Sequence, residues 1–96
     1  MPQLSISVEA EDDIDRIIAY TAAKWGWRQA NRYLAKLEDS FDLLAGNPSI
    51  GRSCDSIRAG LRRFEIGRHV VFYHPGPGGV LVVRVLHQQM LPANYL

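Results

Sequence analysis

The sequence GLRRFEIGRHVVFYHPGPGGVLVVRVLHQQM at residues 60–90 contains three short runs rich in Val, Phe, Tyr and Ile, separated by turn residues. Residues 61–66, 69–74 and 80–87 each have the length and composition of a β-strand. Gly67-Arg68 is a two-residue link with glycine first, which is typical of a tight II′-like hairpin. Residues 74–79 supply a longer turn rich in Pro and Gly. The pattern predicts a three-stranded antiparallel meander.

The N-terminal half predicts one further strand and two helices. Apolar and polar residues alternate over residues 3–8, which is the period of a half-buried strand. Ser7 is placed to cap a helix over about residues 8–25, and Gly26 is a natural stop. A second amphipathic helix follows at once, starting at Trp27 or Arg28, and Gly46-Asn47-Pro48 ends it.

The predicted order of elements is β-α-α-β-β-β, an α+β fold. Because the link between the helices is short, they must form an antiparallel hairpin, and the meander is the apolar surface on which it packs. Residues 49–59 are predicted to be a loop or a single helical turn. The position of the first strand in this small, mainly antiparallel sheet stays open.

Composition limits the class of protein. The 96 residues, 47% hydrophobic and 22% charged, predict a single domain over residues 1–96. No run approaches the roughly 20 apolar residues of a membrane span, and the N-terminus lacks a secretory signal, so a cytoplasmic protein without a membrane partner is expected. Cys54 is the single cysteine, which excludes an internal disulfide and a cysteine-based metal cluster. No metal or cofactor is expected.

The charge is divided unevenly along the chain. Residues 1–50 carry eight acids and five bases, whereas residues 51–96 carry two acids and six bases, all arginine. The resulting charges of −3 and +4 indicate a face that meets an anionic partner. Arginines that merely solvate the outer face of a sheet are the alternative, and charge alone does not separate the two.

The usual catalytic motifs are missing from the sequence. There is no Gly-rich phosphate loop, no paired metal-ligand motif and no Gly-x-Ser-x-Gly elbow. Strand parity places His69 and His74 on opposite sides of the middle strand, and separates His87 from Arg84 in the same way. Hydrogen bonding at strand ends therefore fits these histidines better than catalysis does.

Arg84 stands out because it interrupts an apolar strand. Parity predicts that the helices cover the face of Leu81, Val83 and Val85. Arg84 would then emerge on the open face with Val80, Val82 and Leu86. There it is expected to act in recognition, since its planar fork pairs with carboxylates and phosphates. A salt bridge to Glu65 is the alternative.

The chain also has more large apolar residues than a small core can hide. These are Trp25, Trp27, Tyr33, Leu43, Met90, Leu91, Tyr95 and Leu96. Small proteins rarely expose a large apolar patch unless a partner covers it, so a protein partner is expected.

The chain resembles a ParE-type toxin of the RelE/ParE toxin–antitoxin superfamily. The likeness rests on IIAYTAAKWG at 17–26, QANRYLAKLEDSFDLLAGNPSIGR at 29–52, IRAGLRRFEIGRHVVFY at 57–73 and VVRVLHQQM at 82–90. It implies a toxin that stabilises the cleaved-DNA state of DNA gyrase and halts growth. It also implies tight binding of a ParD-type antitoxin, and contact with operator DNA only through that antitoxin.

Two sets of site residues follow from this resemblance and from the exposed residues above. The expected target-binding set is Arg62, Arg63, Arg68, Arg84, His87, Met90 and Tyr95. The expected antitoxin-binding set is Trp27, Tyr33, Leu34, Leu37, Phe41 and Leu43, of which Leu34, Leu37 and Phe41 divide between groove and core.

Two other functions stay open. RelE-like relatives cut mRNA on the ribosome, and here His87, Arg84 and Arg62 would be the catalytic candidates. The sequence HQQM lacks an adjacent Tyr or second basic residue, and only Lys24 and Lys36 occur, so the ParE-like interpretation is favoured. A non-toxic module whose sole activity is heteromeric assembly is the third possibility.

Overall fold

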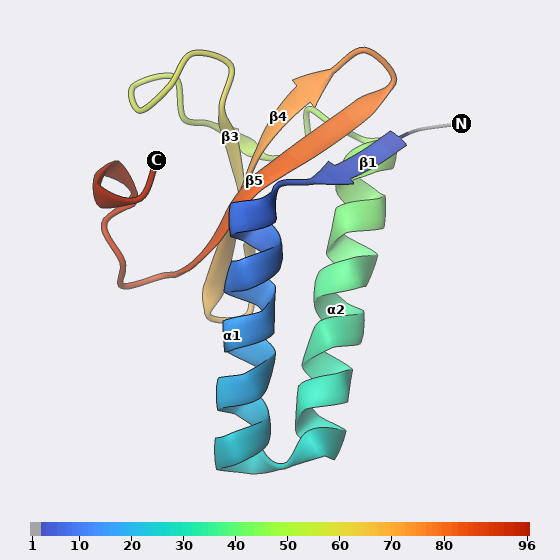
Figure 1. The fold of residues 1–96 in the computed structure, drawn as a ribbon. Coiled ribbons are helices and arrows are strands. Elements are labelled where there is room, and N and C mark those ends of the chain that lie inside the picture. Colours follow the sequence, from blue (N-terminus) through green and yellow to red (C-terminus); the bar gives the residue numbers. More distant parts are fainter. Residues whose placement is uncertain (1–2) are drawn as a thin grey trace.

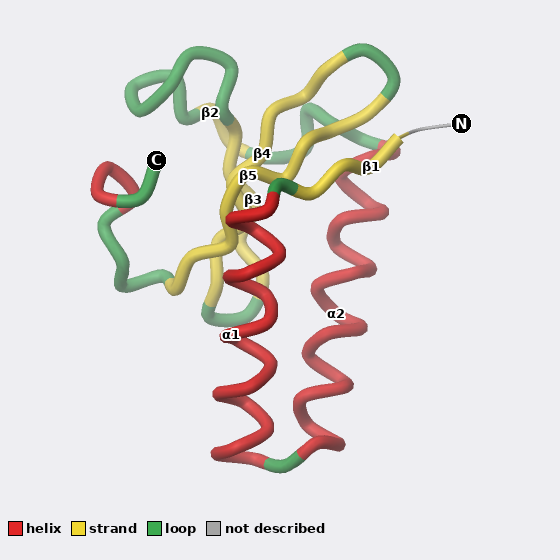
Figure 2. The backbone as a smooth tube through the Cα atoms, viewed as in Figure 1, coloured by secondary structure: helices red, strands yellow, loops and turns green. Residues whose placement is uncertain are grey.

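The computed structural model describes residues 3–96 and has two helices packed on a five-stranded sheet. Helices α1 (Val8–Trp25) and α2 (Trp27–Gly46) form an antiparallel hairpin against the sheet (Figure 1). The sheet order is β1-β5-β4-β3-β2, and Figure 2 shows the strands lying along the upper part of the hairpin. The strands are β1 (Gln3–Ile6), β2 (Arg52–Ser53), β3 (Arg62–Ile66), β4 (His69–Gly76) and β5 (Gly79–His87), and a 3-10 turn, η1 (Pro92–Asn94), follows. The α+β prediction is confirmed.

Local sequence signals set the helix ends as predicted. The Ser7 side-chain oxygen accepts a hydrogen bond from the Ala10 N–H at 3.0 Å, which satisfies one of the free donors at the start of α1. Gly26 has φ +91°, a conformation that suits glycine, and the chain reverses there between the two helices. None of the helices in residues 3–96 is long and apolar enough to span a bilayer.

The structure settles the position of the first strand, which the sequence left open. Strand β1 lies at the sheet edge and runs parallel to β5, with Gln3 opposite Gly79. A Cβ atom at Gly79 would lie 1.8 Å from the Gln3 carbonyl oxygen, so the close approach of β1 requires glycine there. Ser7 continues the contact, since its N–H donates to the Val82 carbonyl oxygen at 2.9 Å.

Two details of the other sheet edge and of the last hairpin differ from the prediction. Residues 52–53, predicted as part of a loop, form the short edge strand β2 against β3. The predicted long turn over residues 74–79 is shorter, because β4 extends to Gly76 opposite Gly79. Pro77 and Gly78 alone make the turn, with φ +80° at Gly78, as a type II turn requires.

A β-bulge at Val83 corrects the predicted faces of β5. Phe72 lies opposite Arg84, but the next residue, Tyr73, lies opposite Val82, so Val83 is an extra residue. The residues that precede the bulge therefore exchange faces: Val80 and Val82 join Val85 in the helix-covered core, while Leu81 is 39% exposed. The prediction of Leu81 and Val83 on the helix-covered face was wrong, because parity was counted without the bulge.

The sheet carries a hydrophobic core on each face. Leu37, Phe41 and Leu44 of α2 pack with Val71 and Tyr73 on the helix-covered face. On the opposite face, Leu61, Val70, Phe72 and Leu86 are buried with Cys54, beneath the residues that follow β2 and the C-terminal residues Met90 and Leu96. The face predicted to be open is thus largely covered by the chain itself.

Candidate partner-binding groove and basic sheet face

A groove lies between the helical hairpin, the β3–β4 turn and the end of β5. Its volume is about 790 Å³, within the range of protein ligand sites. Aromatic side chains contribute much of its wall, from Tyr20 and Trp25 on α1 and Tyr33 on α2. Tyr20 and Trp25 are 64% and 65% exposed, so this wall offers apolar surface to a partner.

Two histidines form the floor of the groove. His69 and His87 are directly opposite each other at the ends of β4 and β5, with ring centres 5.4 Å apart and planes at 87°. His69 Nδ1 lies 2.5 Å from the Tyr33 hydroxyl oxygen, and the Tyr33 hydroxyl donates to the Ile66 carbonyl oxygen at 3.2 Å. Three elements thereby meet in one hydrogen-bonded cluster.

Burial changes the titration of this cluster. The pKa of His69 is lowered to about 4 by burial, and then by the charge of nearby His87. Burial raises the pKa of Tyr33. A hydrogen bond with the Arg68 backbone and the positive charge of Arg68 act in the opposite direction, but their effect is smaller. At neutral pH both His69 and Tyr33 are therefore uncharged, and they act as hydrogen-bonding groups.

The charged residues that line the groove are all basic. They are Arg16 and Lys24 on α1 and Arg68 in the β3–β4 turn. Arg16 Nη2 lies 2.6 Å from Asp12 Oδ2 in an ion pair. Lys24 Nζ lies 5.3 Å from the centre of the Trp25 ring. Arg68 is exposed at the rim. The groove combines an aromatic wall with a basic rim, which suits an amphipathic, acidic ligand.

Arg84 is held within the protein by a carboxylate that the sequence analysis did not select. Its Nε and Nη2 atoms each donate to Asp13 of α1 at 2.8 Å, in a bidentate pair. The Val85 N–H donates to the same carboxylate at 2.9 Å. Val85 follows Val82, which is the last residue of β5 that pairs with β1. Hydrogen bonding to Asp13 raises the pKa of Arg84. The predicted alternative partner, Glu65, was wrong.

The spacing of Asp13 along the sequence indicates that it is buried, which its charge alone does not reveal. It is three residues after Ala10 and four before Ile17, which puts it on the buried face of α1. Asp13 is one of several acids in the first turns of α1, beside Glu9, Glu11 and Asp12, so charge alone does not distinguish it. A carboxylate at 8% exposure on an apolar helix face needs a buried partner, and Arg84 supplies it.

The two arginines that begin β3 also make contacts within the chain. Arg62 donates to the Ser49 and Gly51 carbonyl oxygens at 3.0 and 2.6 Å, and so fixes the turn after α2. Arg63 lies on the opposite face, with its guanidinium carbon 5.6 Å from the centre of the Phe72 ring. Glu65 binds Arg52, and Arg63 approaches it at 3.8 Å.

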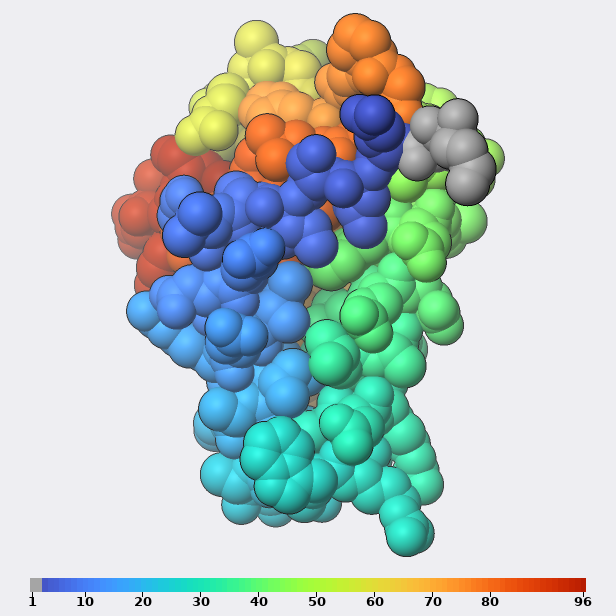
Figure 3. Space-filling view, turned by 45° about the vertical axis from the view of Figure 1, so that its right-hand side comes forward, coloured from blue at the N-terminus to red at the C-terminus, as the bar shows by residue number. Residues whose placement is uncertain are grey.

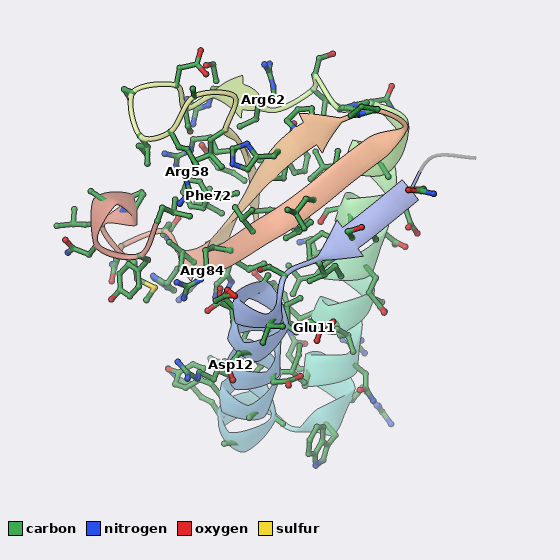
Figure 4. The ribbon with its side chains drawn as sticks, turned by 45° about the horizontal axis from the view of Figure 1, so that its top comes forward. Glu11, Asp12, Arg58, Arg62, Phe72 and Arg84 are labelled. Atoms are coloured by element: carbon green, nitrogen blue, oxygen red, sulfur yellow. The ribbon has the colours of Figure 1, made fainter. Side chains whose placement is uncertain are left out.

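The nuclease candidates are not brought together. Arg62 and His87 face the helices, while Arg84 faces the other way and is bound to Asp13. Figure 4 shows Arg62 and Arg84 separated across the sheet. The structure instead places His87 beside His69 and near Arg68, which was expected to bind the target with it.

Of the C-terminal residues in the target-binding set, Met90 lies against the core of Leu61, Val70, Phe72 and Leu86, and Tyr95 lies against Arg84. Met90 packs on that core, and its sulfur accepts from the His87 N–H at 3.3 Å. The Tyr95 carbonyl oxygen accepts from Arg84 Nη1 at 3.0 Å, and the Tyr95 ring is 5.6 Å from the Arg84 guanidinium carbon. Tyr95 and Leu91 remain 41% and 68% exposed.

The antitoxin-binding set divides between core and surface. Leu37 and Phe41 are 0% and 2% exposed, so they belong to the core and are not available to a partner in this structure. Trp27 and Leu43 are 66% and 42% exposed, and Leu34 and Tyr33 are half-buried. Figure 3 shows the hairpin tip, which carries Trp27, projecting from the body of the protein.

Comparisons with known proteins agree on one family. The family model described as ParE toxin of type II toxin-antitoxin system, parDE, matches residues 4–92. The chain is 44% identical to Toxin ParE1 of Mycobacterium tuberculosis over 86 residues, covering 88% of both chains. It is 39% identical to Toxin ParE1 of Caulobacter vibrioides over 90 residues, covering 94% and 93%.

A solved structure has the same fold. It is described as the chromosomal ParDE TA system from P. aeruginosa, and its matched chain superposes with a TM-score of 0.76 at 17% identity. The match covers 91% of this chain and 96% of that one.

Proposed function

The chain belongs to the ParE toxin family of type II toxin–antitoxin systems, and from this membership we propose that it inhibits DNA gyrase and is neutralised by a ParD-type antitoxin. The family match over residues 4–92 is the observation that carries the proposal. As a gyrase inhibitor the protein holds the enzyme in its cleaved-DNA state, so the result is broken DNA and growth arrest.

The geometry of the arginines supports inhibition by binding over RNA cleavage. A nuclease of the RelE type needs its basic and acid–base groups around one phosphate. Arg84 is committed to Asp13, and Arg62 to backbone carbonyl oxygens. Neither guanidinium is free to approach a phosphate that is bound at His87.

The C-terminal residues are proposed to contact the target. Leu91 and Tyr95 expose apolar surface in the segment after β5, and Arg84 fixes Tyr95 through its carbonyl oxygen. This arrangement holds exposed apolar groups in place before the target arrives, which reduces the entropy lost on binding.

The antitoxin is proposed to cover the hairpin. Trp27, Leu34 and Leu43 offer it apolar surface, and the free edge of β1 can accept a strand. An exposed strand edge of this kind readily pairs with another chain, and an antitoxin segment would remove that exposure.

The decisive experiment adds the purified protein, freed of antitoxin, to gyrase supercoiling and cleavage assays, with ribosome-dependent mRNA cleavage alongside. Trapped linear DNA with intact mRNA is the expected result. Cut mRNA with normal supercoiling would establish a nuclease. No effect in either assay, while a cognate ParD-type antitoxin still binds, would leave a module for assembly only.

A variant pair locates the target contact. The double variant Leu91→Ser, Tyr95→Ser should remove gyrase trapping and leave the far-UV circular dichroism unchanged. Ile50→Ser is the matched control, since Ile50 is a 48% exposed apolar residue outside the C-terminal segment. Equal gyrase trapping by both variants would exclude the C-terminal contact.

A further inference from the structure

The histidine pair in the groove has no acidic partner. The groups that face it are Tyr33 from α2, Arg68 from the β3–β4 turn, and Arg16, Tyr20 and Lys24 from α1. No aspartate or glutamate lines the groove in the described part of the chain, and the nearby Asp12 is bound to Arg16. A second proton on the pair would therefore meet only positive charge and neutral hydroxyls.

The hydrogen bonds of the His69–His87 pair leave one N–H donor available to an anion. His87 Nδ1 accepts the Gln89 N–H at 3.1 Å, so the proton of neutral His87 is on Nε2. This tautomer presents a donor and argues against a metal ligand at that nitrogen. A carboxylate that enters the groove would find this donor, with Arg68 beside it.

The groove fits one class of occupant. Its basic rim requires acidic groups, and its wall of Ile17, Tyr20 and Trp25 requires apolar ones. An amphipathic helix with carboxylates along one flank meets both requirements. We propose that an acidic segment of the antitoxin docks in this groove and that docking drives the uptake of a proton by the His69–His87 pair. This inference rests on the proposed antitoxin partner.

The proton uptake follows from the change in charge around the pair. In the free toxin, burial and then the charge of nearby His87 lower the pKa of His69 to about 4, so His69 is uncharged at neutral pH. A docked carboxylate within a few ångströms favours the protonated form. Because the rings interact directly, the proton belongs to the pair rather than to either histidine.

The consequence is an affinity that depends on pH. A complex that takes up one proton binds more tightly as the pH falls, by up to about tenfold per pH unit. The antitoxin would then hold the toxin most firmly in acidified cells and release it more readily as the pH recovers.

The test is calorimetric titration of the toxin with its cognate ParD-type antitoxin. At pH 7, the dependence of the binding heat on the ionisation heat of the buffer gives the number of protons exchanged. Uptake of about one proton is expected. The double variant His69→Gln, His87→Gln should abolish the uptake and, with it, the gain in affinity as the pH falls.

Two further variants separate the possible failures. His74→Gln is the matched control, because His74 lies on the opposite face of β4 and outside the groove, and it should keep the uptake. Arg68→Glu should weaken binding at least tenfold, since it reverses the charge at the rim. Tight binding with no uptake, or with proton release, would overturn this inference alone. Unchanged binding by Arg68→Glu would place the antitoxin elsewhere, and no binding at any pH would overturn the antitoxin proposal itself.

Discussion

Two clusters of ionisable side chains lie near each other on β5 and differ in how completely their groups are paired. Arg84 has a carboxylate partner, Asp13, whose two oxygens accept three hydrogen bonds from the Arg84 side chain and the Val85 N–H. His87 faces His69, and no carboxylate of the described residues lines the groove around it. The first cluster joins α1 to the sheet, whereas the second lies in an open groove.

The difference shows how similar residues acquire different roles. A paired and nearly buried charge stabilises the native state only while both partners remain, because either one alone is costly to bury. A cluster without a counter-charge is available to a ligand that supplies it. The Arg84–Asp13 cluster is structural because each charge has its partner within the protein. The His69–His87 cluster is a binding candidate because it lacks a counter-charge.

The largest effect is expected from breaking the first cluster. Arg84→Ala would leave the Asp13 carboxylate 8% exposed without its ionic partner, which should cost about 3–5 kcal/mol of unfolding free energy. Urea denaturation measures the loss. Arg52→Ala, which breaks the exposed pair with Glu65, is the control and should cost less than about 1 kcal/mol. Equal losses would show that the Asp13 pair contributes no more than a surface pair.

The His69–His87 cluster should make the unfolding free energy depend on pH. The pKa of His69 is about 4 in the folded protein and 6.5 as the reference value, so between these values the unfolded chain binds a proton that the native state does not. Stability present above pH 6.5 is thus lost as the pH falls toward 4, by on the order of 2 kcal/mol once solvent screening of this half-buried ring is allowed for.

The measurement is the unfolding free energy across that range for the wild type and for His69→Gln. The wild type should lose more stability than the variant, and His74→Gln should keep the wild-type slope. Identical slopes for the wild type and His69→Gln would show that His69 is not held neutral by the fold.

Local sequence signals were enough to predict much of this fold. The Ser7 cap and the Gly26 break set the helix ends within one residue, because each acts on backbone groups a few positions away. The three strands of the meander follow from β-branched and aromatic runs bounded by turn residues. Parity also separated His69 from His74 correctly, because β4 contains no bulge between them.

The features that escaped prediction depend on contacts between distant residues. The extra residue at Val83 has no composition signal, and it exchanged the faces of β5 before Arg84. Asp13 and Arg84 are 71 positions apart, so their pairing requires knowledge of how α1 crosses β5. The groove joins four segments of the chain, and only their assembly shows that Arg68 and His87 lie beside Tyr33.

A smaller effect on stability is expected at Gly67, where the β3–β4 turn lies beside Tyr33. Gly67 has φ +57°, and an added Cβ would lie 2.8 Å from the Tyr33 hydroxyl oxygen. Gly67→Ala should therefore cost about 1–2 kcal/mol and disturb the hydrogen bond between Tyr33 and His69. Gly46→Ala is the control, since nothing lies within 4 Å of its added Cβ, and it should be neutral or slightly stabilising. A neutral Gly67→Ala would show that the turn relaxes without cost.

The smallest effect on stability is expected at the hairpin tip, although the proposed effect on binding there is large. Trp27 is 66% exposed, so Trp27→Ser should change the unfolding free energy by less than about 0.5 kcal/mol. If the antitoxin covers the tip, the same change removes a large aromatic contact and should weaken antitoxin binding at least tenfold, or about 1.4 kcal/mol. Val8→Ser, at a 78% exposed apolar residue outside the tip, should change neither quantity. Unchanged affinity in Trp27→Ser would confine the antitoxin to the groove and sheet edge, and the exposed tryptophan would then need another partner to explain it.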